Sequence, residues 1–392
     1  MLTVEEAQRR VLSLGKPLGE EELAVADAAR RYLAAPVAAR RDQPPADNSA
    51  MDGYAIRFAD LPGPLDIIGE SRAGSPFDGT IGASQAVAIS TGALIPAGAD
   101  TVLVREDAER DGDKVHLTGE GPGEQGRHIR RAGGDFRSAQ TLLKAGDLLT
   151  PGALALAISA GIGSVIVGKR PSLVILSTGD ELAEPGSDAA AEQIYNSNGP
   201  MLSAMVDRLC ADIRMVHAVA DSEEAVRAAI REAEDADVLI TIGGASVGEH
   251  DHVKGSLIAE GADIEFWKVA MKPGKPLLAG RKKRQVLLGL PGNPGSAFVT
   301  ATLFLLPLLR HLSGAASPLP RTGSARLLGP IADGGKRTEF LRARLTQDGI
   351  MPLAKQSSGL VSSLAITDAL IEWPVGAKAK PVDDIVDYIA IG

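Results

Sequence analysis

Four loops rich in glycine, proline and charged residues carry the residue types that could bind a phosphate ester. They read STGDEL at 177–182, GGASVGEHD at 243–251, MKPGKP at 271–276 and PGNPGSA at 291–297. Glycines let backbone N–H groups approach an anion closely, and helix N-termini add partial positive charge. Lysines add full positive charges, and carboxylates are ligands that Mg²⁺ prefers. Together the loops indicate a site for phosphate esters and Mg²⁺.

Each loop taken alone also has an ordinary structural explanation. Gly-Gly after a strand is common in tight turns, and Asp-Glu commonly starts a helix. The sequence contains neither G-x-x-x-x-G-K-[ST] nor G-x-G-x-x-G opening a helix, so neither standard phosphate motif applies. EHDH at 249–252 looks like a transition-metal cluster but lacks the further ligands of a zinc site. The phosphate-ester interpretation therefore depends on all four loops meeting at one place.

The elements predicted around these loops would bring them together. Across 171–313, apolar runs without alternation are separated by amphipathic helices, which indicates a parallel sheet covered on both faces. Ligands of such sheets bind beyond the carboxyl ends of the strands. One helix start is marked by Asp221 as N-cap with Glu224 three residues later. The expected strands are 173–176, 214–220, 238–242, 264–270 and 286–290, and the expected helices are 199–210, 222–235, 251–260 and 295–312.

The rest of the chain has two other styles of sequence. Residues 1–40 predict two helices, the first with Thr3 and Glu6 at capping-box spacing. Residues 54–147 are short strands broken by glycine, which is typical of an all-β region. A helix predicted at 151–163 returns the chain to the helical part, so the β-rich part is expected to be an insertion. After a Pro/Gly/Ser linker, strands return and predict a small β-barrel or sandwich.

The predicted fold is therefore a multidomain α/β and β protein, and a length of 392 residues supports two to four domains. We expect a helical N-terminal domain with an inserted β-rich domain, a doubly wound, mostly parallel α/β domain, and a small C-terminal β-barrel. Their expected bounds are 1–45 with 148–170, 46–147, 171–315 and 316–392, respectively.

Composition excludes several classes of protein. A net charge of −9 and a pI near 5.3 argue against a nucleic-acid surface, which needs a basic face. One cysteine, Cys210, permits neither an internal disulfide nor a zinc site built from cysteines. The apolar run at 298–312 is too short for a membrane span and contains Pro307, and the N-terminus lacks the apolar run of a signal peptide. We expect a cytoplasmic protein without nucleic-acid or membrane partners.

A further segment, DNSAMDGYA at 47–55, follows a proline-rich stretch and has turn chemistry, which alone predicts a capping turn at Asp47. Together with STGDEL, GGASVGEHD, MKPGKP and GLPGNP, in this order, it resembles the molybdopterin molybdenumtransferases, the MoeA and gephyrin E-domain family. The resemblance runs from about residue 4 to the C-terminus and implies an α/β domain of the MogA type. It also implies an enzyme that inserts molybdate into adenylylated molybdopterin, releases AMP, and forms molybdenum cofactor with Mg²⁺ present.

The resemblance further implies a homodimer that receives its substrate from a molybdopterin adenylyltransferase. Asp52 would be delivered to the α/β site of the partner subunit, while Asp47 keeps the capping role. The implied catalytic residues are Asp52, Glu181, Asp251, Lys268, Lys272 and Lys275, of which Glu181 and Asp251 would hold the metal. Molybdate would be held by Lys272, Lys275, Arg342 and Ser358. The implied substrate-binding residues are Thr91, Asp135, Ser177, Thr178, Gly179, Asp180, Asp221, Gly243, Gly244, Ser246, Pro291, Gly292, Asn293 and Pro294.

Small departures from the family pattern leave alternatives open. Ala245 and Gly295 stand where Val or another apolar residue is usual, and Ser357 replaces a usual Gly, so either Ser357 or Ser358 could face the ligand.

Two other functions compete with the transferase: a gephyrin-like dimeric scaffold that binds peptide segments with little or no insertase activity, and an unrelated Mg²⁺-dependent nucleotide-binding enzyme. The sequence does not separate molybdate from tungstate, because both are tetrahedral dianions of similar size.

Overall fold

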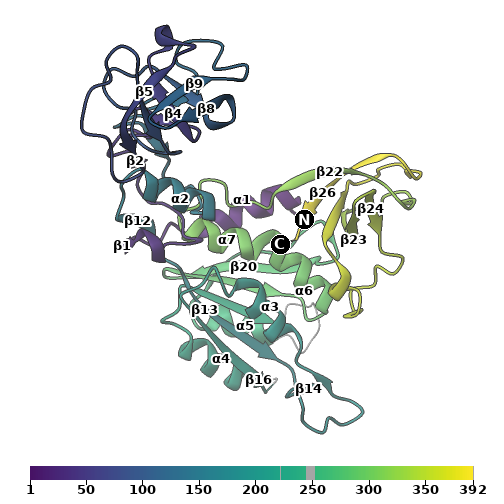
Figure 1. Ribbon diagram of the computed structural model, residues 1–392. Coiled ribbons are helices and arrows are strands. Elements are labelled where there is room, and N and C mark those ends of the chain that lie inside the picture. The colour runs from purple at the N-terminus through teal and green to yellow at the C-terminus, as the bar shows by residue number, and fades with distance from the viewer. Residues whose placement is uncertain (221, 244–251, 392) are drawn as a thin grey trace.

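The computed structural model describes residues 1–220, 222–243 and 252–391, and it contains three six-stranded sheets (Figure 1). The predictions made for Asp221, Gly244, Ser246 and Asp251 lie outside the described residues.

The central sheet has the strand order β16-β13-β17-β21-β20-β18. The first four strands are parallel, and β20 and β18 continue the sheet in antiparallel pairings, so the prediction of a mostly parallel sheet is confirmed. The strand β20 was not predicted. The bounds are β13 Ser172–Thr178, β16 Asp212–Val219, β17 Val238–Ile242, β18 Asp263–Lys268, β20 Pro276–Lys282 and β21 Gln285–Leu290.

Helices cover both faces of this sheet because its strands bury side chains on both sides. On β13, Leu173 and Ile175 pack into one core, while Val174 and Leu176 pack into the other. The first core includes residues of α1, α3, α6 and α7, and the second includes residues of α4 and α5. These helices are α1 Val4–Leu14, α3 Asn198–Val206, α4 Glu223–Glu232, α5 His252–Ala259, α6 Pro294–Thr300 and α7 Leu306–Leu312, and the π-helical turn η4 Ala301–Leu305 joins the last two.

The predicted cap of α4 is wrong by one residue. The N-cap is Ser222, whose side chain accepts a hydrogen bond from the Ala225 N–H at 3.3 Å. Serine and aspartate are comparably good N-caps, so composition could not choose between the neighbouring positions.

One of the two helices predicted in residues 1–40 is present. Helix α1 begins after Thr3, whose side chain accepts from the Glu6 N–H at 3.2 Å. In place of the second helix, β1 Glu20–Ala24 pairs antiparallel with β12 Ser164–Gly168, and the 3₁₀ turn η1 Val25–Asp27 follows. Local helix propensity is a weak prior, and here the packing of η1 against α2 Pro151–Ser159 in a small core outweighs it.

The β-rich segment forms a lobe at one end of the molecule (Figure 1). Its sheet has the order β7-β4-β6-β5-β9-β8. The bounds are β4 Gly53–Ile56, β5 Leu65–Ser71, β6 Gln85–Ile89, β7 Thr101–Val104, β8 Ala108–Asp111 and β9 Lys114–Leu117. At its base, β2 Val37–Ala38 pairs with β11 Thr141–Leu143, and β3 Asn48–Ser49 pairs with β10 Ile129–Arg130.

The C-terminal strands form a sheet that curls back on itself. The order is β19-β23-β25-β26-β22, with β24 also paired to β23. A bridge between Leu327 and Ile350 joins the end of β22 to β24, as a small barrel requires. The bounds are β19 Met271–Lys272, β22 Thr322–Arg326, β23 Thr338–Thr346, β24 Gly349–Pro352, β25 Ala369–Trp373 and β26 Ile385–Ala390. The strand β19 belongs to the MKPGKP loop, so this loop is part of the C-terminal sheet.

In the described part of the chain, one continuous helical run, Pro294–Leu312, has the length and mean hydropathy of a membrane span. It matches the helix predicted at 295–312 to within one residue and is longer than the apolar stretch 298–312, because the helix continues through Pro307 after the π-helical turn η4. The run lies inside the protein, since 83% of its 18-residue window is buried.

Candidate functional site

Three of the loops predicted to share a site begin side by side at the carboxyl ends of β13, β17 and β21, the second of them described only at Gly243. Gly243 has φ +87°, and a Cβ there would lie 3.0 Å from the Thr178 carbonyl oxygen. The Thr178 hydroxyl donates to the Ile242 carbonyl at 3.4 Å. A Cβ on Gly292 would lie 3.7 Å from the Gly243 Cα. Backbone therefore approaches backbone closely here, and glycine makes this approach possible.

The other predicted binding residues of these loops lie at the same edge. Ser177 is buried near the end of β13. Pro291 follows β21 and is buried as well. Asn293 is the N-cap of α6, and Pro294 begins the helix. The Asn293 side chain makes no capping hydrogen bond.

Two asparagines that the sequence analysis missed line the same junction. The Asn198 Nδ2 donates to the Gly292 carbonyl at 2.6 Å, and the Asn196 Oδ1 accepts from the Gly199 N–H at 3.2 Å. The Asn198 Oδ1 and the Asn196 Nδ2 are buried and have no partner within the described structure. Both groups are therefore candidates for a polar ligand. The signal in the sequence was the run Asn-Ser-Asn just before a predicted helix.

The predicted metal-binding residues are described only in part. Asp180 and Glu181 follow β13 with exposed carboxylates, a hard oxygen donor set of the kind that suits Mg²⁺. The second predicted ligand, Asp251, lies outside the described residues. Among the residues that are described, no three His, Cys, Asp or Glu side chains are arranged to hold a metal ion.

The lysine loop is held between the C-terminal sheet and α6. The Lys272 Nζ lies 3.0 Å from the Glu339 carboxylate, and the two residues are paired across β19 and β23. Gly274 lies against α6, because a Cβ there would lie 2.6 Å from the Thr300 side chain. Lys275 is exposed next to this contact. The structure thus fixes the loop backbone and leaves the Lys275 side chain on the surface.

Lys268 ends the edge strand β18 beside an aromatic ring. Its Nζ lies 4.3 Å from the ring centroid of Trp267, and the Lys254 Nζ lies 3.5 Å from the same centroid. Both are cation–π contacts, which hold the two lysines at the surface of this strand.

The Ser358 loop packs on the first turn of α6. The Gly295 N–H donates to the Ser358 carbonyl at 2.8 Å. A Cβ on Gly295 would lie 2.9 Å from that oxygen and 3.0 Å from the Arg342 Nη1. The departure of Gly295 from the family pattern therefore has a structural reason in this chain. Ser358 is half-buried and Ser357 is exposed, so the choice between their hydroxyls as ligands stays open.

Arg342 is buried, with 1% of its surface exposed, and holds the Ser358 loop from within. Its closest hydrogen bonds run to the Ser363 Oγ at 2.6 Å and to the Ser357 carbonyl at 2.8 Å. Longer ones, of 3.4–3.5 Å, reach the Gln356 Oε1 and the carbonyls of Lys355 and Leu360. Burial lowers the pKa of this guanidinium.

Each of the five N–H groups of Arg342 thus has a protein acceptor. The prediction that Arg342 contacts molybdate directly therefore does not fit this conformation, in which no donor is left for the ion. Arg342 is instead placed to position the Ser358 loop.

A second group of predicted residues lies in the β-rich lobe. The Asp52 carboxylate accepts hydrogen bonds from the Thr91 N–H at 2.6 Å and the Thr91 hydroxyl at 2.9 Å. These two bonds lower the pKa of Asp52, and both residues are exposed. The structure thus brings together two predicted site residues that are distant in sequence.

Asp47 does not cap a turn, and the prediction of that role was wrong. Its carboxylate accepts from the Ala132 N–H at 2.8 Å and from Arg131 at 2.5 Å. Burial raises the pKa of Asp47, but these two hydrogen bonds outweigh it and lower the pKa overall. Asp47 therefore ties the Asp52 loop to the RRAGGDF segment. Asp135 of that segment is exposed, and its N–H donates to the Gln43 carbonyl at 2.9 Å.

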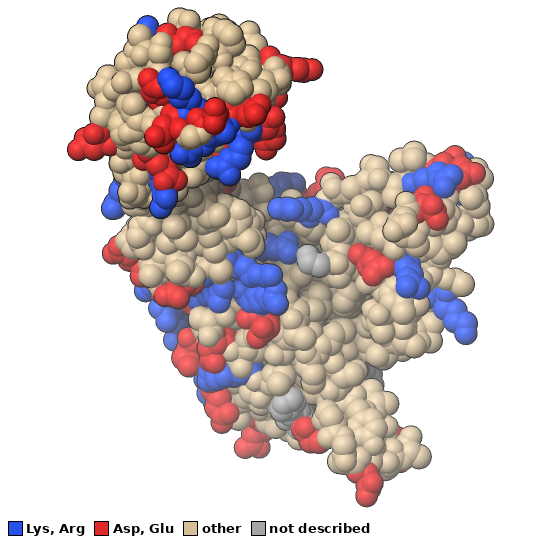
Figure 2. Space-filling model, in the orientation of Figure 1, with Lys and Arg blue, Asp and Glu red and all other residues tan. Residues whose placement is uncertain are grey.

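Within one chain, the two groups lie in different parts of the molecule. Asp52 and Thr91 belong to the lobe of β4 and β6, whereas the lysine loop lies beside β23, at the other side of the body (Figure 1). Figure 2 shows the surface hollowed between the lobe and the C-terminal sheet, with Lys and Arg side chains along the hollow. One chain thus divides the predicted site residues between two places.

Comparison with known proteins accounts for nearly the whole chain. Residues 2–161 match the MoeA N-terminal region (domain I and II), 174–311 match a probable molybdopterin binding domain, and 324–391 match the MoeA C-terminal region (domain IV). A molybdopterin biosynthesis MoeA protein from Pyrococcus horikoshii has a similar structure, with a TM-score of 0.84, 25% identity and full coverage of both chains.

Curated relatives agree with these matches. A molybdopterin molybdenumtransferase from Haemophilus influenzae is 38% identical, and the match covers 80% of this chain and 78% of that protein. One from Nostoc is 35% identical over 88% of this chain and 83% of that protein. One from Staphylococcus aureus is 31% identical over 99% of this chain and 95% of that protein. The chain therefore belongs to the molybdopterin molybdenumtransferase (MoeA) family.

Proposed function

We propose that this protein inserts molybdate into adenylylated molybdopterin, releases AMP and forms molybdenum cofactor. Its family supports the molybdopterin-related substrate and the transferase activity. The charge and hydrogen-bond donors of the site support molybdate as the ion. Release of AMP follows from the adenylylated form of the substrate.

The observation that carries the proposal is the convergence of two loops on α6. The lysine loop contacts α6 through Gly274 and Thr300, and the Ser358 loop contacts it through Gly295. Molybdate is a dianion, so its site needs hydrogen-bond donors and positive charge. Lys275 supplies charge and Ser358 supplies a hydroxyl, each from a loop whose backbone is fixed. The cost of ordering these groups on binding is therefore small.

The molybdopterin nucleotide would bind at the carboxyl ends of β13, β17 and β21. The loops at these ends carry Gly179, Gly243 and Gly292, and residues without a side chain let phosphate oxygens approach the backbone. Glu181 and Asp251 would hold Mg²⁺, which neutralises phosphate charge when bound. Asn198 presents a buried carbonyl oxygen that could accept from a polar group of the substrate.

We further propose that the active site is shared by two copies of the chain. Asp52 and Thr91 lie in the lobe, away from the lysine loop of their own chain (Figure 1). A homodimer in which each lobe serves the partner's α/β site would unite them. The dimer would receive adenylylated molybdopterin from an adenylyltransferase. It would work in the cytoplasm. The chain has one cysteine and so forms no internal disulfide, which suits a reducing compartment.

Turnover tests the activity directly. The purified chain is incubated with adenylylated molybdopterin, Mg²⁺ and molybdate, and AMP and active cofactor are measured. The proposal expects both products, and it expects Lys275→Ala to need about tenfold more molybdate, a loss of about 1.4 kcal/mol. Arg344→Gln, an exposed charge change on β23, is the matched control. Absence of AMP and cofactor with the wild-type chain would instead favour the scaffold function.

Mixed dimers test the shared site. Asp52→Ala and Lys275→Ala subunits are combined in equal amounts and assayed at a molybdate concentration too low for Lys275→Ala alone to turn over. In each mixed dimer of a two-fold assembly one site carries both changes and the other is intact, so about a quarter of the wild-type activity should return. If no activity returns, although mixed dimers are demonstrated by mass spectrometry, both residues serve the same subunit's site.

A further inference from the structure

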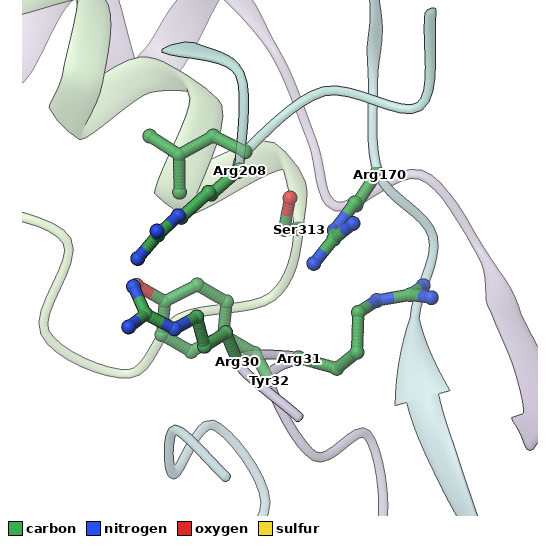
Figure 3. Close-up of a pocket in the computed structure, with 7 residues that line it drawn as sticks. Arg30, Arg31, Tyr32, Arg170, Arg208 and Ser313 are labelled. Carbon is green, nitrogen blue, oxygen red and sulfur yellow. The ribbon is translucent and has the colours of Figure 1, made fainter. Parts of the chain in front are cut away.

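A narrow pocket lies where four distant segments of the chain meet (Figure 3). Its space, mouth included, is about 170 Å³. The four segments are the stretch after η1, the connection between β12 and β13, the stretch after α3 and the stretch after α7. The lining residues are Arg30, Arg31, Tyr32, Arg170, Arg208, Leu209 and Ser313. Four of the seven are arginines, in a chain whose net charge is −9.

Three of the four arginines form no ion pair in the part of the chain that the structure describes. Arg31 is paired with Glu21, but Arg30, Arg170 and Arg208 form no ion pair within the described residues. Figure 3 shows the tips of Arg30 and Arg208 close to each other and to the hydroxyl of Tyr32, with Arg170 directed into the same space.

The electrostatic environment of the pocket agrees with an excess of positive charge. Burial lowers the pKa of Arg170, and the charge of Arg31 lowers it further, while Cys210, Glu21 and Asp207 act in the opposite direction. Burial raises the pKa of Tyr32, against the influence of two more arginines, at positions 310 and 321. Similar charges held this close repel each other unless an anion lies between them.

Arg31 lines the pocket with most of its surface buried. Arg31 is 9% exposed, and its terminal nitrogen donates to the Gly168 carbonyl at 2.7 Å as well as to Glu21. Its Nε is buried and has no partner among the described residues. Figure 3 shows this guanidinium directed away from the tips of Arg30 and Arg208, so Arg31 contributes a wall of the pocket and its positive charge.

We propose that this pocket binds a small divalent oxyanion with the chemistry of inorganic phosphate, separately from the active site. Guanidinium groups present forked donors that match tetrahedral oxyanions, and the Tyr32 hydroxyl adds another donor. The pocket is too narrow to hold a nucleotide, and a single phosphate group would bind at its mouth, against the arginine tips. The bound anion links the N-terminal segment of Arg30 to the α/β body that carries Arg208, and acts as a clamp between them.

Equilibrium dialysis with labelled inorganic phosphate tests the site on the full chain. Because the proposed molybdate site can also take up phosphate, Lys275→Ala serves as the reference protein. In this reference background, Arg170→Gln and Arg208→Gln should each weaken phosphate binding at least tenfold. Arg344→Gln should not, because Arg344 is an exposed arginine far along the C-terminal sheet. Phosphate should also raise the melting temperature of the reference protein more than chloride at equal ionic strength does.

Competitors identify the source of the oxyanion. Displacement by molybdate or sulfate alone supports a free inorganic ion, and displacement by AMP supports a phosphate monoester whose remainder lies outside the pocket. Unchanged phosphate binding in Arg170→Gln and Arg208→Gln would overturn the proposal. Dissociation of these variants into monomers, with no effect of phosphate, would also overturn it, because carboxylates of a second copy would then fill the pocket.

Discussion

The role of Arg342 can be tested by comparing two substitutions, Arg342→Lys and Arg342→Ala. A residue that contacts molybdate through its charge should be rescued in part by lysine. A residue that holds the Ser358 loop through a fork of five donors should not, because lysine cannot reproduce the planar fork.

The magnitude follows from the geometry of the buried guanidinium. Its two short bonds, of 2.6 Å to Ser363 and 2.8 Å to Ser357, involve a charged donor and are worth about 1.5–3 kcal/mol each. The three hydrogen bonds of 3.4–3.5 Å add little to this stabilisation. The cost of burying an uncompensated guanidinium offsets part of the sum, so we expect each substitution to destabilise the loop by about 2–4 kcal/mol.

Hydrogen exchange measures this change locally. The Gly295 N–H is bonded to the Ser358 carbonyl, so its exchange rate reports the opening of the loop. A loss of about 2–4 kcal/mol should accelerate exchange about 30- to 700-fold in both variants, at tenfold per 1.4 kcal/mol. Both variants should also need more molybdate for turnover, to the same extent.

Two results would refute this reasoning. In the first, Arg342→Lys restores the molybdate response while Arg342→Ala does not, which would indicate direct contact with the ion. In the second, neither variant changes the exchange rate of the Gly295 N–H, which would show that the loop is held by other contacts.

Two further predictions concern the Asp52 loop and the contact of the Ser358 loop with α6. Thr91→Val removes the hydroxyl that donates to Asp52 and should raise the pKa of Asp52 toward its ordinary value, as measured by carbon NMR titration of the carboxyl group. Because folding lowers the pKa of Asp52, the stabilisation that this pair gives the folded state is lost as the pH falls through that pKa. In the variant this loss should begin at a higher pH. An unchanged titration of Asp52 would contradict the role of the Thr91 hydroxyl. Gly295→Val should destabilise the Ser358 loop by about 1–3 kcal/mol, because its Cβ would lie 2.9 Å from the Ser358 carbonyl. Wild-type exchange at the amide of residue 295 would show that the loop adapts to the larger side chain.

The sequence was most informative where the hydrophobic pattern was long. The alternation of buried strands and amphipathic helices across 171–313 predicted the central sheet and the edge where its loops meet. The strand β20 was missed because PLLAGRK follows a proline-rich loop and has no turn signal of its own. The second N-terminal helix was wrong because LAVADAARRYLAA has helix-forming residues, yet pairing and packing with distant segments decide its structure.

The chemistry of the site was less accessible than its location. The resemblance implied that Arg342 in EFLR binds molybdate, and only the fold shows that this arginine is buried under its own loop. Likewise, Asp47 has turn chemistry in sequence, but a contact with Arg131, distant in sequence, decides its role. Burial and long-range partners are set by tertiary structure, so residue types alone could not predict these roles.

The two-residue strand β19 has a consequence for how this chain can vary. Lys272 is paired with Glu339 both in the ladder and through their side chains, so a change at either position alters the environment of the other. Replacing Glu339 with a neutral residue would leave the lysine untethered, whereas the double change Lys272→Arg with Glu339→Asp would keep opposite charges across the ladder. Insertions should be tolerated in the linker before β22. They should be excluded between Met271 and Lys272, the two paired residues of β19, where one added residue would shift the ladder and turn the lysine to the opposite face.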